Sequence, residues 1–87
     1  MERIEEKLVI KNHQGLHARP AAIFVQIANT FNSSVKLAKD DDVVDGKSII
    51  AVLSLGATQG TVVNLIVEGR DAKEAVLELK KFLENDD

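Results

Sequence analysis

The alternation of apolar and polar residues predicts four short strands. Over residues 4–11 the apolar side chains fall on one side and the charged side chains on the other, which is typical of a half-buried strand. Residues 63–67 alternate in the same way near the other end of the chain. Between them, 35–37 and 43–44 are predicted as two short strands joined by the acidic turn 40–42.

Three other segments have the spacing of helices. Apolar residues recur every three or four positions over 20–30, and again over 75–83, where the amphipathic stripe is cleanest. A shorter apolar segment, 49–55, lies between them. The pattern therefore predicts three helices.

Flanking residues predict where two of these helices begin. Ser48 stands directly before the second segment and is a favoured N-cap, and Gly56 follows as a stop signal. Asp71 with Glu74 three residues later resembles a capping box, with aspartate in the role of serine or threonine. We therefore expect the side chain of Asp71 to cap the last helix.

The elements follow the order β-α-β-β-α-β-α. Tight turns between strands favour an antiparallel sheet with the helices packed on one face, so the fold class expected is an α+β two-layer sandwich. No repeat or linker interrupts the 87 residues. One domain over residues 1–87 is predicted.

Composition excludes several classes of protein. The net charge of −3, the absence of Trp and Tyr and the presence of only three Phe argue against a nucleic-acid partner. No apolar run is long enough to insert into a membrane, and the acidic residues at the N-terminus do not resemble a signal peptide. A cytoplasmic protein is expected. Without cysteine there is neither a disulfide nor a thiolate metal site.

The chemistry-bearing residues gather in one stretch, residues 15–20. It reads Gly-Leu-His-Ala-Arg-Pro and holds one of two histidines and the only proline, directly before the first helical segment. A neutral imidazole is a nucleophile at physiological pH, and a helix start offers unpaired backbone N–H groups. An arginine adds a permanent, fork-shaped cation. His17 beside Arg19 therefore predicts phosphate chemistry.

Two registers are open for the start of this helix. Proline suits a first helical turn and biases the residue before it away from the α region. Either Arg19 is the N-cap and Pro20 opens the helix, or His17 is the N-cap of a slightly distorted first turn. In both registers the imidazole lies beside the positive end of the helix.

Other catalytic groups are missing around His17. No Ser or Cys stands beside it for activation, and the chain has no Gly-x-x-x-x-Gly-Lys nucleotide loop. His13 and His17 lack nearby carboxylates or thiols that would complete a metal site. No metal and no cofactor are expected. Either His17 is an exposed loop histidine without a chemical role, or it carries the reacting group itself.

Two separate motifs resemble those of one protein family. Residues 15–22, Gly-Leu-His-Ala-Arg-Pro-Ala-Ala, resemble the active-site motif of HPr, the histidine-containing phosphocarrier protein of the bacterial phosphoenolpyruvate:sugar phosphotransferase system. Residues 47–50, Lys-Ser-Ile-Ile, followed by Ser-Leu-Gly at 54–56, resemble that family's regulatory-serine region at the expected distance. Residues 59–63 and the final amphipathic helix also fit, so the resemblance covers nearly the whole chain.

The resemblance implies both a fold and a role. The fold would be an open-faced sheet of four antiparallel strands covered on one face by three helices. His17 would accept a phosphoryl group on Nδ1 from phospho-enzyme I and pass it to the IIA domain of a sugar transporter. Arg19 matches the family's active-site arginine, and the backbone amides of Ala18 and Arg19 match its helix-end donors. Such a protein is a monomeric carrier and not an enzyme, because its partners supply the catalysis.

A second surface is expected around Ser48. This serine is a structural cap, and the resemblance also implies regulatory phosphorylation by a serine kinase, with a phosphorylase and a transcriptional regulator as further partners. Residues 49–53 are apolar all round, whereas a helix on a sheet buries only one stripe. Exposed apolar residues next to His17 would form a docking surface, and deeper burial in the small core is the alternative. The residues expected at this surface are Ala22, Ile49, Ile50 and Leu53.

Other functions are weaker readings of the same residues. Within the family, a nitrogen-related branch would use the same chemistry at His17. A purely regulatory relative is disfavoured, since such relatives lack the active-site histidine. A small-molecule or RNA-binding α+β module would share the element order, but the acidic charge and scarce aromatics count against RNA. An enzyme in its own right is least favoured, because no second catalytic group accompanies His17.

Overall fold

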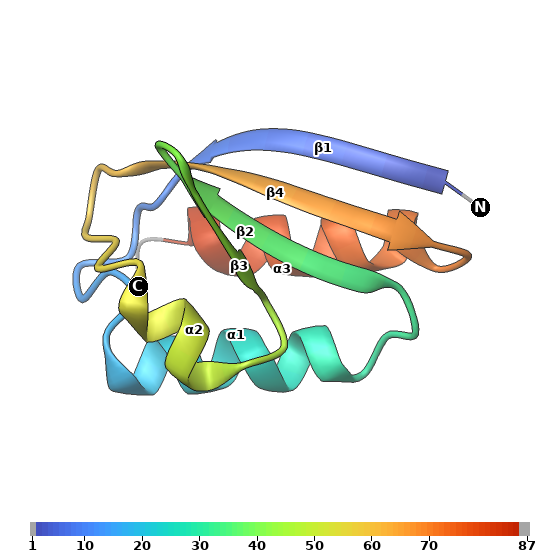
Figure 1. Ribbon diagram of the computed structural model, residues 1–87. Helices are drawn as coiled ribbons and strands as arrows, with labels where there is room; N and C mark the ends of the chain where they lie inside the picture. Colours follow the sequence, from blue (N-terminus) through green and yellow to red (C-terminus); the bar gives the residue numbers. More distant parts are fainter. Residues whose placement is uncertain (1, 86–87) are drawn as a thin grey trace.

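The computed structural model describes residues 2–85; residues 1, 86 and 87 of the predicted domain lie outside the described residues. Figure 1 shows one sheet with the helices gathered on one of its faces. The elements are β1 (Glu2–Val9), α1 (Ala18–Asn29), β2 (Ser34–Lys39), β3 (Asp42–Asp45), α2 (Ile49–Ser54), β4 (Val62–Gly69) and α3 (Ala72–Glu84). All seven predicted elements are present, in the predicted order.

The sheet has the strand order β1-β4-β2-β3, and each neighbouring pair is antiparallel. The last strand in sequence therefore lies in the middle of the sheet, between β1 and β2. Its register places Leu8 opposite Val63 and Leu37 opposite Leu65, so apolar side chains line up in rows on the helix side. The α+β open-faced sandwich is confirmed.

The core lies between the sheet and the helices. Because successive side chains of a strand point to opposite faces, one alternate set from each long strand is buried under α1 and α3. Phe24 of α1 is fully buried and is the largest side chain in this core. The strand residues buried with it are Leu8, Val35, Leu37, Val63, Leu65 and Val67, and α3 contributes Ala72, Ala75, Val76, Leu79 and Leu83.

The first strand ends earlier than the alternation predicts. It is predicted over 4–11, but β1 ends at Val9. Ile10 is nevertheless buried, its N–H donates to the Thr61 carbonyl at 3.0 Å, and its own carbonyl accepts from the N–H of Gly60 at 2.7 Å. The buried Ile10 side chain continues the apolar pattern beyond the strand. The two hydrogen bonds connect the loop before α1 to the loop before β4.

The predicted capping box at the start of α3 is wrong. Asp71 is the N-cap residue, but its side chain makes no bond to its own helix. Its carboxylate instead accepts hydrogen bonds from the backbone N–H of Asn32 at 2.8 Å and of Ser33 at 2.9 Å, and from the hydroxyl of Ser33. These residues follow α1, about 40 positions away in sequence, so Asp71 joins the end of one helix to the start of another.

Among residues 2–85, no helix is long and apolar enough to cross a membrane.

Candidate functional site

His17 is the N-cap of α1. Its backbone is extended (φ −80°, ψ −170°), and its carbonyl accepts the first helical hydrogen bond from the N–H of Ala21 at 2.8 Å. The structure therefore selects one of the two registers that the sequence leaves open. The alternative, a helix opened by Pro20, is wrong, because the helix already begins at Ala18. Pro20 becomes the third helical residue, where it has no N–H to leave unpaired.

The start of α1 leaves its hydrogen-bond donors open. The backbone N–H groups of Ala18 and Arg19 donate to no group of the part of the chain that the structure describes. The His17 ring is exposed and makes no capping bond. No acidic residue occupies the first turn of the helix, so nothing there offsets its positive end. An anion that reached the imidazole would meet two main-chain donors.

Arg19 adds a cation to this helix end. Its side chain is exposed, and none of the ion pairs or hydrogen bonds found among residues 2–85 involves its guanidinium group. An arginine that contacts no carboxylate within the protein is available to an outside anion as a fork of N–H donors. The structure thus brings together the three features predicted from the sequence: His17, the amides of Ala18 and Arg19, and the guanidinium.

The loop before His17 is held from behind. The N–H of Leu16 donates to the Ala57 carbonyl at 2.9 Å, and the Leu16 side chain is buried. Gly15 has φ +61°, and a Cβ there would lie 2.7 Å from the Ala57 carbonyl oxygen and from Thr58 Cα. Only glycine fits both that backbone angle and that contact. The backbone before His17 is therefore held in place, although the His17 ring itself makes no capping bond.

Sequence reasoning noted residues 59–63 only as part of the family resemblance and did not predict that residues 57–61 anchor the loop before His17. Besides Ala57, this anchoring segment supplies Gln59, whose Nε2 lies 3.3 Å from the Lys11 carbonyl oxygen and 3.3 Å from His13 Nδ1. Only the glycine at position 15 gave a local signal, because it indicates a turn or a close contact without saying what is contacted. The residues that these groups contact are more than 40 positions away in sequence. The periodicity of apolar residues does not predict contacts over such distances.

The short helix α2 lies beside α1 (Figure 1). Ile50 is 78% exposed, Ile49 39% and Leu53 38%, whereas Val52 is fully buried. The prediction that some of these three side chains stay exposed is thus confirmed, most clearly for Ile50. Ala22 of α1 is half-buried. Their role in docking stays a prediction.

Ser48 is the N-cap of α2, as predicted. Its Oγ accepts a hydrogen bond from the N–H of Ala51 at 3.3 Å, and the residue is half-buried. The structural role of this serine is therefore confirmed, and its regulatory role stays a prediction.

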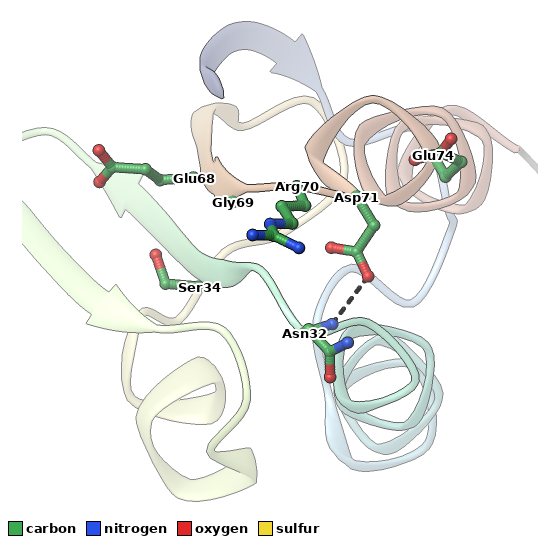
Figure 2. A pocket seen from close by; sticks show the side chains of 7 residues that line it. All are labelled: Asn32, Ser34, Glu68, Gly69, Arg70, Asp71 and Glu74. Atoms are coloured by element: carbon green, nitrogen blue, oxygen red, sulfur yellow. Dashed lines mark hydrogen bonds between the residues drawn. The ribbon is translucent and has the colours of Figure 1, made fainter. Parts of the chain in front are cut away.

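The molecule has two hollows that bear on function. The Arg19 hollow, of about 330 Å³, lies beside the start of α1 and is lined by Asn12, His13, Gln14, Arg19, Pro20, Ile23 and Phe82. The Asp71 hollow, of about 640 Å³, is lined by Asn32, Ser34, Glu68, Gly69, Arg70, Asp71 and Glu74. None of the residues 15–22 lines the larger one, so size does not locate the phosphate chemistry. Figure 2 shows its Asp71 carboxylate turned toward Asn32.

The described residues 2–85 contain no group of three or more His, Cys, Asp or Glu placed to hold a metal ion.

A comparison with protein families shows to which family this chain belongs. The family described as "PTS HPr component phosphorylation site" matches residues 4–85. The chain belongs to the HPr family of phosphocarrier proteins. The phosphotransferase-system family suggested by residues 15–22 is therefore confirmed.

Individual relatives of this HPr-family chain agree. The HPr-like protein Crh of Bacillus subtilis is 42% identical over 83 residues, covering 95% of this chain and 98% of Crh. The crystal structure of the phosphocarrier protein HPr from Bacillus anthracis superposes with a TM-score of 0.92 at 35% identity, covering 95% of this chain and 99% of the other. This chain is therefore similar both to a phosphocarrier protein HPr and to an HPr-like protein.

A third relative bears on assembly. An HPr from Thermoanaerobacter tengcongensis, described as a dimer, is 51% identical over 86% of both chains and has a TM-score of 0.75. The monomer expected for this chain therefore stays a prediction.

Proposed function

We propose that this chain is a phosphocarrier in which His17 accepts a phosphoryl group from phospho-enzyme I and passes it to IIA domains of sugar transporters. The phosphoryl group originates from phosphoenolpyruvate. The observation that supports this most directly is the helix end itself: an exposed imidazole with no internal hydrogen bond stands next to two unpaired amides.

The step is a phosphoryl transfer to a ring nitrogen. A bond forms between His17 Nδ1 and phosphorus while the bond from phosphorus to the donor group of phospho-enzyme I breaks. The attacking nitrogen needs its lone pair, so the ring proton sits on Nε2 during the attack. The amides of Ala18 and Arg19 and the Arg19 guanidinium stabilise the charge on the phosphoryl oxygens. The second transfer, to a IIA domain, is the same step in reverse with a different partner.

The first prediction tests the acceptor. Incubation with enzyme I and phosphoenolpyruvate labels the wild-type chain in an acid-labile manner, and His17→Ala abolishes the label. Because the His17 ring makes no capping bond, His17→Ala should change the free energy of unfolding by no more than about 0.5 kcal/mol. A folded His17→Ala protein that labels as well as wild type contradicts the proposal.

The second prediction concerns docking by Ala22, Ile49, Ile50 and Leu53. Ile50 is largely exposed, so Ile50→Glu places a charge in the proposed interface without disturbing the core. We expect enzyme I to bind this variant about tenfold more weakly, as measured by calorimetry. Leu77→Glu is the matched control, since Leu77 is 68% exposed on α3. Unchanged affinity for the Ile50 variant, with native circular dichroism, removes the docking role.

Ser48 is proposed as a regulatory site on the same surface. A phosphoserine brings about −1.5 to −2 charges, and at an N-cap that charge is tolerated. The modification would alter docking at the neighbouring Ile49 and Ile50 and leave the fold unchanged. A serine kinase, a phosphorylase and a transcriptional regulator are the partners that this role requires.

Further parts of the proposal concern the chain as a whole. Residues 1–87 form one HPr-like domain, which acts as a cytoplasmic monomer and leaves catalysis to its partners. A nitrogen-related branch would use the same His17 chemistry, and identification of the captured IIA-type partner separates it from sugar uptake.

A further inference from the structure

The Arg19 hollow has the opposite charge to the chain around it. The protein carries 14 acidic and 11 basic residues, yet no Asp or Glu lines this hollow, and the cation Arg19 does. The guanidinium contacts no carboxylate of residues 2–85. A concave surface lined by one sign of charge attracts the other sign, so the hollow suits an anionic group.

The same hollow has an apolar side. Pro20 and Ile23 come from the first turns of α1, and Phe82 comes from the last turn of α3. Ile23 is 39% exposed, and Phe82 is half-buried. An occupant that covered them would remove apolar surface from water, which is favourable. The hollow therefore suits an anion carried on an apolar stem.

Gln59 determines which nitrogen of His13 can donate. The Gln59 amide nitrogen lies 3.3 Å from both the Lys11 carbonyl oxygen and His13 Nδ1. An amide nitrogen only donates, so Nδ1 accepts and the ring proton is on Nε2. No hydrogen bond within residues 2–85 uses that Nε2–H group. His13 is thus held in place at one nitrogen and offers a donor at the other.

From these three observations we infer that the Arg19 hollow receives an acidic side chain, glutamate or aspartate, of a protein partner, and that His13 helps to select it. The carboxylate accepts from the guanidinium and from His13 Nε2–H, and its methylene stem covers Ile23 and Phe82. A free phosphate ion would use the donors and leave the apolar side in water. This inference rests on the proposed function, which supplies enzyme I as the partner to test.

The test compares His13→Glu with a matched control in binding to unphosphorylated enzyme I. The control is Arg70→Gln, at an exposed cation that lines the Asp71 hollow (Figure 2). Both substitutions lower the net charge by one unit at neutral pH. We expect His13→Glu to raise the Kd about tenfold, and Arg70→Gln to change it less than about twofold. The difference in Kd between the His13→Glu and Arg70→Gln proteins should become smaller at 0.5 M salt, because salt screens charge interactions.

A third variant, His13→Gln, provides a readout that a purely structural role would not move. Glutamine keeps an N–H donor at this position and adds no charge. We expect His13→Gln to bind enzyme I within about threefold of wild type. Binding as weak as that of His13→Glu would overturn the role of the His13 donor.

Two other results would overturn the inference. One is equal affinity of the His13→Glu and Arg70→Gln proteins for enzyme I. The other is competition by inorganic phosphate alone against enzyme I for wild type but not for His13→Glu, which would make the hollow a site for free anions. Docking to unphosphorylated enzyme I needs no phosphoryl transfer. Failure of wild type to become labelled at His17 would therefore overturn the proposed function separately.

Discussion

Two helices of this protein begin without a side-chain cap, and they treat their positive ends in opposite ways. At the start of α1, His17 and Arg19 are exposed, and no acidic residue occupies the first turn. At the start of α3, Asp71 and Glu74 place carboxylates near the helix end. The α3 end is balanced by the protein's own charges and contributes to stability. The α1 end is left unbalanced, which suits it to receive charge from outside.

The side chains at the two N-caps differ in the same sense. The His17 ring makes no hydrogen bond within residues 2–85, whereas the Asp71 carboxylate accepts three, from Asn32 and Ser33. The hydrogen bond from the Ser33 hydroxyl, and those from the backbone of Asn32 and Ser33, hold the pKa of Asp71 below its ordinary value. A carboxylate with three donors holds two helices together, and a ring with none is free to react.

The largest expected effect comes from giving α1 the charge pattern of α3. Arg19→Glu removes the guanidinium that we propose as an N–H donor to the phosphoryl oxygens, and it places an acid in the first turn of α1. Phosphorylation by enzyme I should fall by on the order of 100-fold. The free energy of unfolding should rise by about 0.3–1 kcal/mol, because an acid favours a helix N-terminus. Labelling kinetics and urea denaturation report the two effects, and a drop in both quantities would contradict the comparison.

A smaller effect is expected from removing the Asp71 carboxylate. Asp71→Ala should lower the urea midpoint at pH 7 and leave the rate of phosphorylation unchanged. The folded-state pKa is lowered from the ordinary 3.8, so the carboxylate stabilises the fold fully above pH 3.8. That stabilisation is lost as the pH falls through the folded-state pKa. The midpoints of wild type and variant should therefore converge in acid, and a gap that persists at pH 2 would point to packing.

The smallest expected effect is that of Glu74→Gln. Neutralising this first-turn acid should lower the free energy of unfolding by about 0.3–1 kcal/mol at low salt. The loss should shrink when salt is added, because exposed charges are screened. Labelling at His17 should not change. A change in labelling would show that the two helix ends are coupled, which the comparison denies.

Residues close together in sequence were predictable, and those that meet only in the fold were not. The active-site motif could be interpreted because its residues lie in one continuous stretch, residues 15–22. The strands and helices followed from the periodicity of apolar residues. The partners of Asp71 lie 38 and 39 residues away, and Gln59 lies 46 residues from His13. No pattern of local spacing records such contacts.

The start of α1 shows how tertiary contacts override a local preference. The preference of Pro20 for the first helical position favoured a later start. The anchoring of Leu16 to Ala57 fixes where the loop ends, and the helix begins at Ala18 despite the bias that proline imposes on Arg19. That some apolar side chains of α2 stay exposed, in contrast, followed from the sequence pattern alone, because a short helix that is apolar all round has more apolar surface than a sheet can cover.

The position of Pro20 has a consequence for the lifetime of the phosphohistidine that we propose at His17. A phosphoryl group has three outer oxygens, and a helix N-terminus ordinarily offers three free N–H groups in its first turn. With proline as the third residue, the helix has only the two from Ala18 and Arg19. One oxygen is therefore left to water, a side chain or the next protein. A group held by an incomplete set of donors is easier to surrender, so proline at this position favours a carrier that releases its cargo over one that stores it.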